Sequence, residues 1–371
     1  MDLATFAVNN GFIEAQIRGY RLGFLREEHY NQMKNFHSLE ELFQYLAAES
    51  DYGEYIDSSN VSVNALKGAM RRKLADEVSQ VEMNCSAEVC RFIFFIRATY
   101  MIDNVMNILE GIKTGANFKR LLAAIDPLGY FPELNSVEIA GSDLAVLYET
   151  VLIDTPISPF FAQYIEANTR ELKTYNEVQS FFRDERPEKV RSSLKRIHLE
   201  AFHAHVAGLN ATSAQIMQDL LALEADFRTI QIVYNSIEDP KNERQRVRET
   251  LCPTVGHLYP LHYHALKGVE SAEQLREALR GVRNYRRTLA EVAEPGAQEE
   301  GAARTLEDAM YEEEVRNLSL VFDQQASLAV LYAYVRLKQQ EIRNVVWVSE
   351  MISRGLEKNH PAWKKIVVPF A

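Results

Sequence analysis

Residues 305–354 contain neither glycine nor proline and read TLEDAMYEEEVRNLSLVFDQQASLAVLYAYVRLKQQEIRNVVWVSEMISR. Their apolar members recur at intervals of three, four and seven positions, the spacing that places them on one face of a helix. A straight helix of this length would extend for roughly 75 Å, which is longer than a compact domain. The sequence therefore predicts a helix with a bend or a break that buries one face in a core.

The composition is typical of a folded globular protein. Of 371 residues, 47% are hydrophobic and 25% are charged, and the formal net charge is -11. This negative charge argues against a broad nucleic-acid-binding surface. The apolar run at residues 92–96 ends at Arg97, and no apolar run approaches the roughly 18 residues of a membrane span. No signal peptide is recognisable. We therefore expect no nucleic-acid partner, and membrane contact only through partner proteins.

The three cysteines, Cys85, Cys90 and Cys252, form an odd and sparse set that is typical of a reducing compartment. Cys85 and Cys90 lie five positions apart in a segment that is predicted to be helical, which is poor geometry for a disulfide. We interpret all three as thiols of the core.

A similar order of segments occurs three times along the chain. Each cycle has a serine that is predicted to start a helix, and these serines are Ser38, Ser142 and Ser271. Each cycle ends in a long predicted helix that has a pair of polar residues towards its C-terminal end, at 103–104, 228–229 and 343–344. We therefore predict three similar helical domains, residues 1–115, 116–240 and 241–371, with the last helices of the first domain beside the C-terminal helices. No run of alternating β-branched residues is present, so the predicted class is all-α.

Other boundaries follow from local patterns. A helix is expected from Phe12 to about Leu25, with Ile13, Ile17 and Leu22 on one side. Residues 61–109 and 188–237 are each expected to be largely helical. Residues 294–304 are rich in proline, glycine, alanine and glutamate and are expected to form an exposed loop.

No familiar catalytic motif occurs in the sequence. A phosphate-binding glycine loop, a dinucleotide fingerprint, HExxH, CxxC and GxSxG are all missing. The histidines within 198–205 and 257–264 form the one metal-like cluster, but His203 and His205 lie two positions apart and do not share a helix face. We interpret them as surface or hydrogen-bonded histidines, and we predict no catalytic residue, metal or cofactor.

Several charged residues interrupt apolar helical segments and need partners: Arg97, Asp103, Asp226, Arg228, Glu341, Arg343 and Glu350. Burial of an unpaired charge costs several kcal/mol, so these residues either pair between helices or face a shared concavity that binds a partner. On this basis the candidate interface or network residues are Asp103, Arg228, Arg343, Asn344, Trp347 and Glu350. Arg343, Trp347 and Glu350 are expected on one side of their helix, with Val345, Val346 and Ile352 projecting elsewhere.

A series of motifs resembles the subunit d family of eukaryotic vacuolar-type proton ATPases. The resemblance covers nearly the whole chain, in order. It rests on Asn10-Gly11, Arg18-Gly19, Asp51-Tyr52-Gly53, Tyr100-Met101-Ile102-Asp103-Asn104-Val105, Ile153-Asp154-Thr155-Pro156, Leu223-Glu224-Ala225-Asp226, Leu258-Tyr259-Pro260 and Gln339-Gln340-Glu341 with Arg343-Asn344 and Val346-Trp347. Two departures are Phe227, where the family usually has a basic residue, and Met351, where it commonly has cysteine.

The resemblance implies an all-helical funnel of three pseudo-repeated domains, similar to the related subunit of the archaeal A-type ATPases. It also implies a non-catalytic subunit that couples the central stalk to the proteolipid ring. The implied location is peripheral, on the cytoplasmic face of an endomembrane such as that of a vacuole, lysosome or endosome. Two alternatives remain: a helical enzyme with its active site around Arg343 and Glu350, and a helical scaffold outside the ATPase.

Overall fold

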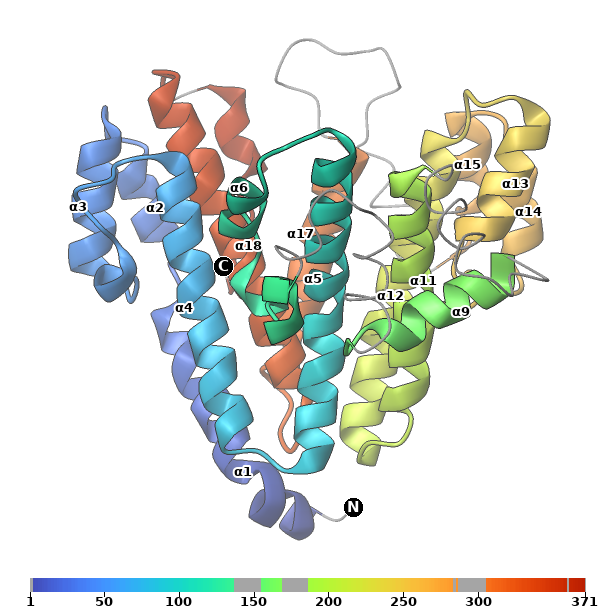
Figure 1. The fold of residues 1–371 in the computed structure, drawn as a ribbon, viewed down its shortest axis with the longest axis horizontal. Coiled ribbons are helices and arrows are strands. Elements are labelled where there is room, and N and C mark those ends of the chain that lie inside the picture. The colour runs from blue at the N-terminus through green and yellow to red at the C-terminus, as the bar shows by residue number, and fades with distance from the viewer. Residues whose placement is uncertain are drawn as a thin grey trace.

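The computed structural model describes residues 3–136, 155–168, 186–282, 285, 305–358 and 360–370. Every regular element in these ranges is a helix, which confirms the all-α prediction (Figure 1). The long helices are α1 (Leu3–Tyr20), α4 (Val63–Met83), α5 (Ala87–Lys113), α11 (Pro187–Val206), α12 (Ala211–Asn235), α17 (Leu306–Val321) and α18 (Ala329–Ser353).

Shorter helices connect the long ones. The α-helices among them are α2 (Glu27–Met33), α3 (Leu39–Glu49), α6 (Phe118–Ala123), α9 (Ser158–Asn168), α13 (Lys241–Leu251), α14 (Tyr263–Lys267) and α15 (Ala272–Ala278). The 3-10 helices are η1 (Arg21–Gly23), η2 (Gly53–Tyr55), η3 (Pro127–Gly129), η4 (Pro132–Ser136) and η5 (Pro361–Lys365). In Figure 1 the ends of the long helices gather at the lower side, near the N-terminus, while α3 and α14 lie at opposite upper corners.

The segment 305–354 is broken, as predicted. α17 ends at Val321 and α18 begins at Ala329, with Ala326 between them in a left-handed conformation (φ 57°). Helix α1 holds this connection: the Glu14 carboxylate accepts from the Ala326 backbone N–H at 3.1 Å, and Arg18 donates to the Phe322 carbonyl at 2.6 Å. The chain can therefore reverse here because the first helix supplies the polar partners that the exposed backbone needs.

The two other long segments that were predicted to be helical each contain two helices. Residues 61–109 contain α4 and most of α5, separated at residues 84–86, where Ser86 caps α5. Residues 188–237 contain α11 and α12, separated at residues 207–210. Ser38 and Ser271 cap α3 and α15 as predicted, whereas Ser142 and the predicted loop at 294–304 lie outside the described residues.

The N-terminal helix differs from the prediction. It runs from Leu3 to Tyr20, so Asn10 and Gly11 lie within it instead of opening it. Ile13 and Ile17 are buried, but Leu22 belongs to η1 and is 79% exposed. The apolar spacing was correct for the helix itself but did not continue through its C-terminal turn.

Two hydrophobic clusters form the core. The larger combines buried residues of α1, α3, α4, α5, α9, α11, the first half of α12, the end of α17 and α18. The smaller lies around the second half of α12, α14, α15 and the start of α17. Helix α18 packs against α1, α3, α4 and α17, so the C-terminal helix lies against the first 83 residues of the chain.

Contrary to the prediction, one helix in the described ranges, α5, is long and apolar enough to cross a membrane by length and composition. However, 61% of its apolar window is buried inside the structure. It packs against α11, α4, α6 and η3, and Arg97 in its middle donates to the carbonyls of Leu128 and Tyr130, both at 2.9 Å. The apolar character of α5 is accounted for by this packing.

Two tight turns, each with a glycine, are held by a buried polar side chain of a long helix. In the first, the Leu25 N–H, which follows Gly23, donates to Glu341 of α18 at 2.6 Å. In the second, Asn104 of α5 exchanges two hydrogen bonds with the backbone of Asp126, at 2.8 and 2.9 Å. A Cβ at Gly129 would lie 2.4 Å from the Tyr100 backbone, so the close approach of this turn to α5 requires glycine.

A third turn repeats the arrangement. The backbone N–H groups of His257 and Leu258 donate to Asp226 of α12, at 3.1 and 3.0 Å. Gly256 has a φ of 115°, and a Cβ there would lie 2.4 Å from the Asp226 carboxylate. Each of the three turns is therefore fixed by a polar group that only a distant helix provides.

Glu341→Ala should destabilise the protein strongly. The substitution removes the acceptor of the Leu25 N–H and leaves the buried Lys338 ammonium without its nearest carboxylate, which typically costs about 3–5 kcal/mol. Glu350→Ala, on the exposed side of the same helix, should change the free energy of unfolding by no more than about 0.5 kcal/mol. Urea denaturation followed by circular dichroism measures both; equal, small effects would contradict the role given to Glu341.

Candidate functional site

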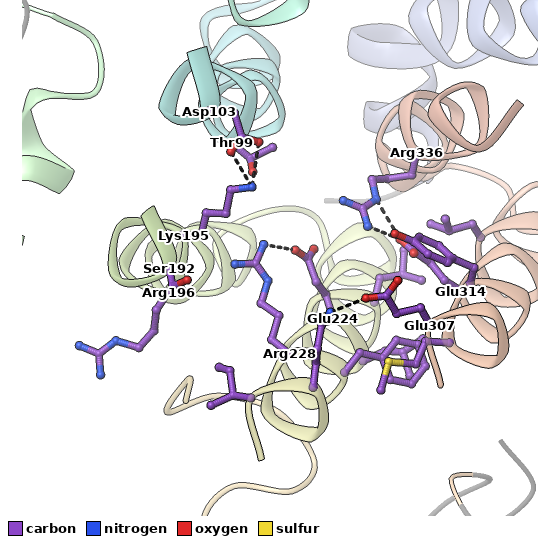
Figure 2. A pocket seen from close by; sticks show the side chains of 18 of the residues that line it. Thr99, Asp103, Ser192, Lys195, Arg196, Glu224, Arg228, Glu307, Glu314 and Arg336 are labelled. Carbon is purple, nitrogen blue, oxygen red and sulfur yellow. Dashed lines mark hydrogen bonds and ion pairs between the residues drawn. The ribbon is translucent and has the colours of Figure 1, made fainter. Parts of the chain in front are cut away.

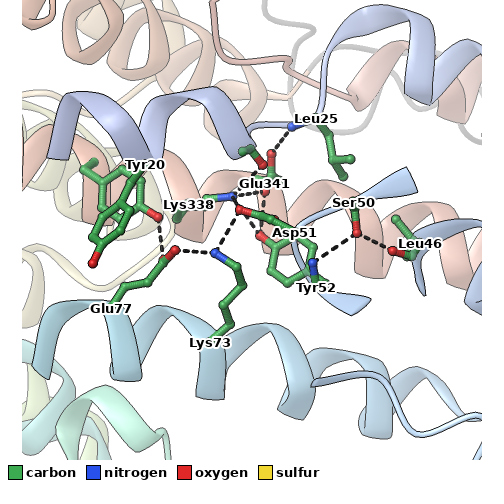
Figure 3. Close-up of polar contacts among 12 residues, drawn as sticks. Tyr20, Leu25, Leu46, Ser50, Asp51, Tyr52, Lys73, Glu77, Lys338 and Glu341 are labelled. Atoms are coloured by element: carbon green, nitrogen blue, oxygen red, sulfur yellow. Dashed lines mark hydrogen bonds and ion pairs between the residues drawn. The ribbon is translucent and has the colours of Figure 1, made fainter. Parts of the chain in front are cut away.

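A buried ionic network surrounds Glu341 (Figure 3). The Glu341 carboxylate accepts from Lys338 at 2.8 Å and from the Tyr52 hydroxyl at 2.5 Å, and neither Glu341 nor Lys338 is more than 1% exposed. Lys73 of α4 continues the network with ion pairs to Asp51, at 2.8 Å, and to Glu77. This cluster therefore ties α18 to α4 and to the segment after α3.

The tyrosines of this network act as hydrogen-bond donors. Burial, followed by the negative charge of Glu341, raises the pKa of Tyr52 well above its usual value. Burial and Glu77 do the same to the pKa of Tyr334, which donates to Glu77 at 2.5 Å. Both hydroxyls therefore stay protonated, and the network is a structural one. The contacts of Glu341 are thus contacts within the protein, to its own helix and to the N-terminal region.

A cavity of about 430 Å³ lies between α5, α11, α12, α17 and α18, and we call it the paired-charge cavity (Figure 2). Two of the predicted residues, Asp103 and Arg228, line it. Asp103 forms ion pairs with Lys195 at 2.7 Å and with Arg191 at 3.4 Å, which join α5 to α11. Burial lowers the pKa of Lys195, and the charge of Asp103 opposes this shift.

The opposite wall of the paired-charge cavity carries a second set of ion pairs. Arg228 donates to Glu224 of the same helix at 2.6 Å, and the Tyr332 hydroxyl donates to Glu224 at 2.9 Å. Arg336 of α18 donates to Glu314 of α17 at 2.9 Å. Burial alone would raise the pKa of Glu224, but Arg228 and Arg336 outweigh it and lower this pKa to about 2. Its carboxylate is thus held ionised in the wall.

The predicted residues between 343 and 350 do not line the paired-charge cavity. Arg343 packs over the ring of Tyr311, 3.6 Å from its centroid, and Trp347 donates through its indole N–H to the Ala362 carbonyl at 3.0 Å. Both line a second cavity, of about 410 Å³ between α4, α17, α18 and η5. We call it the basic pocket because Lys67, Arg71, Arg343 and Lys365 line it.

The remaining predictions for this helix hold only in part. Arg343, Trp347 and Glu350 all lie on its more exposed side, as expected, but Glu350 lines neither cavity and lies 3.9 Å from Arg354. Asn344 is buried, and its amide donates to the Val367 carbonyl at 2.7 Å, so its role is to hold the C-terminal segment. Val346 was expected to project elsewhere, but it lines the basic pocket beside Arg343.

Histidines and cysteines form no reactive centre in the part of the chain that the structure describes. No group of three metal-ligating side chains occurs there. His198 is buried against the Phe95 carbonyl, at 2.7 Å, and burial lowers its pKa to about 4, so it is a neutral core residue. Cys252 is a buried free thiol, as predicted, whereas Cys85 and Cys90 are free and only half-buried, and Cys85 precedes α5 instead of lying within it.

Sequence reasoning missed most of the paired-charge cavity. Glu224 and Arg228 are an i, i+4 pair and could have been recognised from spacing alone. Lys195, Glu314 and Arg336 could not, because their partners lie on other helices and no local pattern reports which helices meet.

The acid sensitivity of the protein should depend on Glu224. Its pKa falls from 4.5 in the unfolded chain to about 2 in the folded one, so its contribution to stability is complete above pH 4.5 and disappears as the pH falls towards 2. The shift corresponds to about 3 kcal/mol. Glu224→Gln should therefore flatten the decline of stability over this pH interval, as measured by urea denaturation at a series of pH values. Glu312→Gln, an exposed acid on α17, is the control, and an unchanged slope for Glu224→Gln would contradict the assignment.

Comparison with known proteins identifies the family. The sequence profile of the family described as ATP synthase (C/AC39) subunit matches residues 13–362. A rice protein named probable V-type proton ATPase subunit d is 32% identical over 362 residues, which cover 96% of each chain. Subunit d1 of the V-type proton ATPase of Arabidopsis thaliana is 31% identical over 95% of each chain, and subunit d of Saccharomyces cerevisiae is 31% identical over 96% of each. The chain therefore belongs to the ATP synthase (C/AC39) subunit family.

Proposed function

We propose that this chain is subunit d of a V-type proton ATPase, a non-catalytic subunit that couples the central stalk to the proteolipid ring. The observation that carries this proposal is its similarity to proteins named subunit d over 94–96% of its length, in plants, fungi, Dictyostelium and Drosophila. Its place would be peripheral, on the cytoplasmic face of an endomembrane.

A coupling subunit has to resist twisting, and the packing supports this requirement. The long helices are joined by buried polar contacts that span large sequence separations, such as Glu341 with Leu25 and Tyr52. The three glycine turns support the predicted division into three domains, because each turn is held by the last long helix of another predicted domain. We propose that the paired-charge cavity, whose wall is fixed by such pairs, contributes to the surface that receives the stalk.

The end of the molecule near the N-terminus carries exposed apolar side chains, and we propose that it contacts the ring. Val8 and Phe12, one helical turn apart on α1, are 85% and 68% exposed. Met83, at the end of α4, is 76% exposed, and Figure 1 shows α1 and the connection from α4 to α5 at the same lower end. Clustered exposed apolar groups are typical of interaction surfaces.

The enzyme alternative loses its geometric basis. It requires Arg343 and Glu350 in one site, yet Arg343 lines the basic pocket and Glu350 lies outside it, beside Arg354. In the paired-charge cavity, Asp103, Glu224 and Glu314 are held in ion pairs and are poor candidates for proton transfer.

Purification from detergent-solubilised membranes tests the proposal. The tagged wild-type chain should bring proteolipid and stalk subunits with it. Phe12→Glu should lose the proteolipid selectively, because it places a charge in the apolar contact of α1. Leu261→Glu, at a residue that is also largely exposed (85%) but lies in the segment before α14, is the matched control and should retain all partners.

Two results would contradict the proposal. One is purification of the wild-type chain without any ATPase subunit. The other is retention of the chain on membranes after alkaline washing, as an integral protein would be retained. A Phe12→Glu variant that keeps the proteolipid would overturn the proposed ring contact alone.

A further inference from the structure

The basic pocket has a charge arrangement that the proposed coupling function does not use. Lys67 and Arg71 approach from successive turns of α4, Arg343 from α18 and Lys365 from η5. The acids that line it are Glu307 and Asp308. Four cations and two carboxylates thus surround a space of about 410 Å³, in a chain whose net charge is -11.

The cations in this pocket are short of acceptors. Asp308 is approached by Arg343 at 3.8 Å and by Lys365 at 3.7 Å, both longer than a hydrogen bond. Its Oδ2 atom is already engaged, because it accepts from the backbone and the hydroxyl of Thr305 at the start of α17, at 3.1 and 2.8 Å. Two cations therefore share one carboxylate, and neither of them is within hydrogen-bond distance of it.

Two further donors have no partner among the described residues. Lys67 forms no ion pair or hydrogen bond there, and the amide nitrogen of Gln339 is buried without an acceptor. Burial and the neighbouring Arg71 lower the pKa of Lys67, while Asp126 and Glu350 oppose the shift. Arg71 itself lies 3.2 Å from Asp126. The pocket therefore offers more donors than acceptors, and for the buried Gln339 amide the lack of an acceptor is costly.

We propose that the basic pocket binds a small phosphate compound with several negative charges. Phosphate groups present many terminal oxygens and can accept from several separate donors at once. The volume is in the range of small-molecule sites. The contact of Arg343 with the Tyr311 ring, 3.6 Å from its centroid, restrains the guanidinium group and does not use its N–H groups as donors to oxygen. The half-buried ring of Trp347 adds an apolar wall.

Isothermal titration calorimetry with the isolated full-length chain tests this proposal, using pyrophosphate and inositol hexakisphosphate as probes. Sulfate at matched ionic strength reports binding by charge alone. The wild type should bind at least one phosphate probe more tightly than sulfate. Lys67→Gln should bind that probe about tenfold more weakly, since one charge-assisted hydrogen bond is lost. The melting temperature of each variant, followed by circular dichroism, shows that the fold is retained.

Lys364→Gln is the matched control, because Lys364 is exposed and adjacent to Lys365 but does not line the pocket. It should bind as the wild type does. If neither phosphate probe binds, the proposal is overturned. It is also overturned if Lys67→Gln and Lys364→Gln lose affinity equally. Binding of a polyglutamate peptide without binding of phosphates would assign the pocket to an acidic protein segment instead. All these readouts are independent of assembly with ATPase subunits, so they fail or succeed separately from the proposed coupling function.

Discussion

The closure of the molecule depends on one buried carboxylate, that of Glu341. It is fully buried, and a charge in that position is tolerated only because Lys338, the Tyr52 hydroxyl and the Leu25 N–H all donate to it. Two of these donors precede it by 289 and 316 residues in the chain. The hydrogen bonds therefore fix the C-terminal helix against the N-terminal region, and a competing arrangement would leave a buried charge without partners.

The two other glycine turns are also held by a buried polar side chain of a long helix, but the hydrogen-bonding group differs. Asn104 is neutral and satisfies both the donor and the acceptor of the Asp126 backbone, whereas Asp226 accepts from two backbone groups and from the Tyr285 hydroxyl. Each of these helices holds the turn that comes next in the chain, and α18 holds the first. Neighbouring parts of the chain are thus joined by buried polar contacts, which suits a subunit proposed to transmit torque.

Local patterns predicted what local physics determines. The helical spacing of 305–354, its break and the capping by Ser38 and Ser271 could all be read from the sequence. Asn104 was identified as a late polar position, and Asp226 and Glu341 as charges that need partners, but the turns that these three residues hold were not predicted. The partners depend on which backbone groups each helix contacts in the folded protein, and local sequence does not encode those contacts. The burial of Asn344 and the pocket position of Val346 were missed for the same reason.

The two cavities are both lined by charged side chains, but they differ in how those charges are paired. In the paired-charge cavity, Asp103, Glu224 and Glu314 each have a cation within 3 Å, so each of these carboxylates is neutralised by a partner. In the basic pocket the nearest acid, Asp308, is committed to the cap of α17, and the cations around it remain at longer distances. Helices α17 and α18 border both cavities, so the ion pairs on one side stabilise two of the helices that form the basic pocket, including α18, which carries Arg343 and the unpartnered Gln339 amide. The basic pocket can keep its excess of donors because the surrounding helices are stabilised by other contacts, among them those of Glu341.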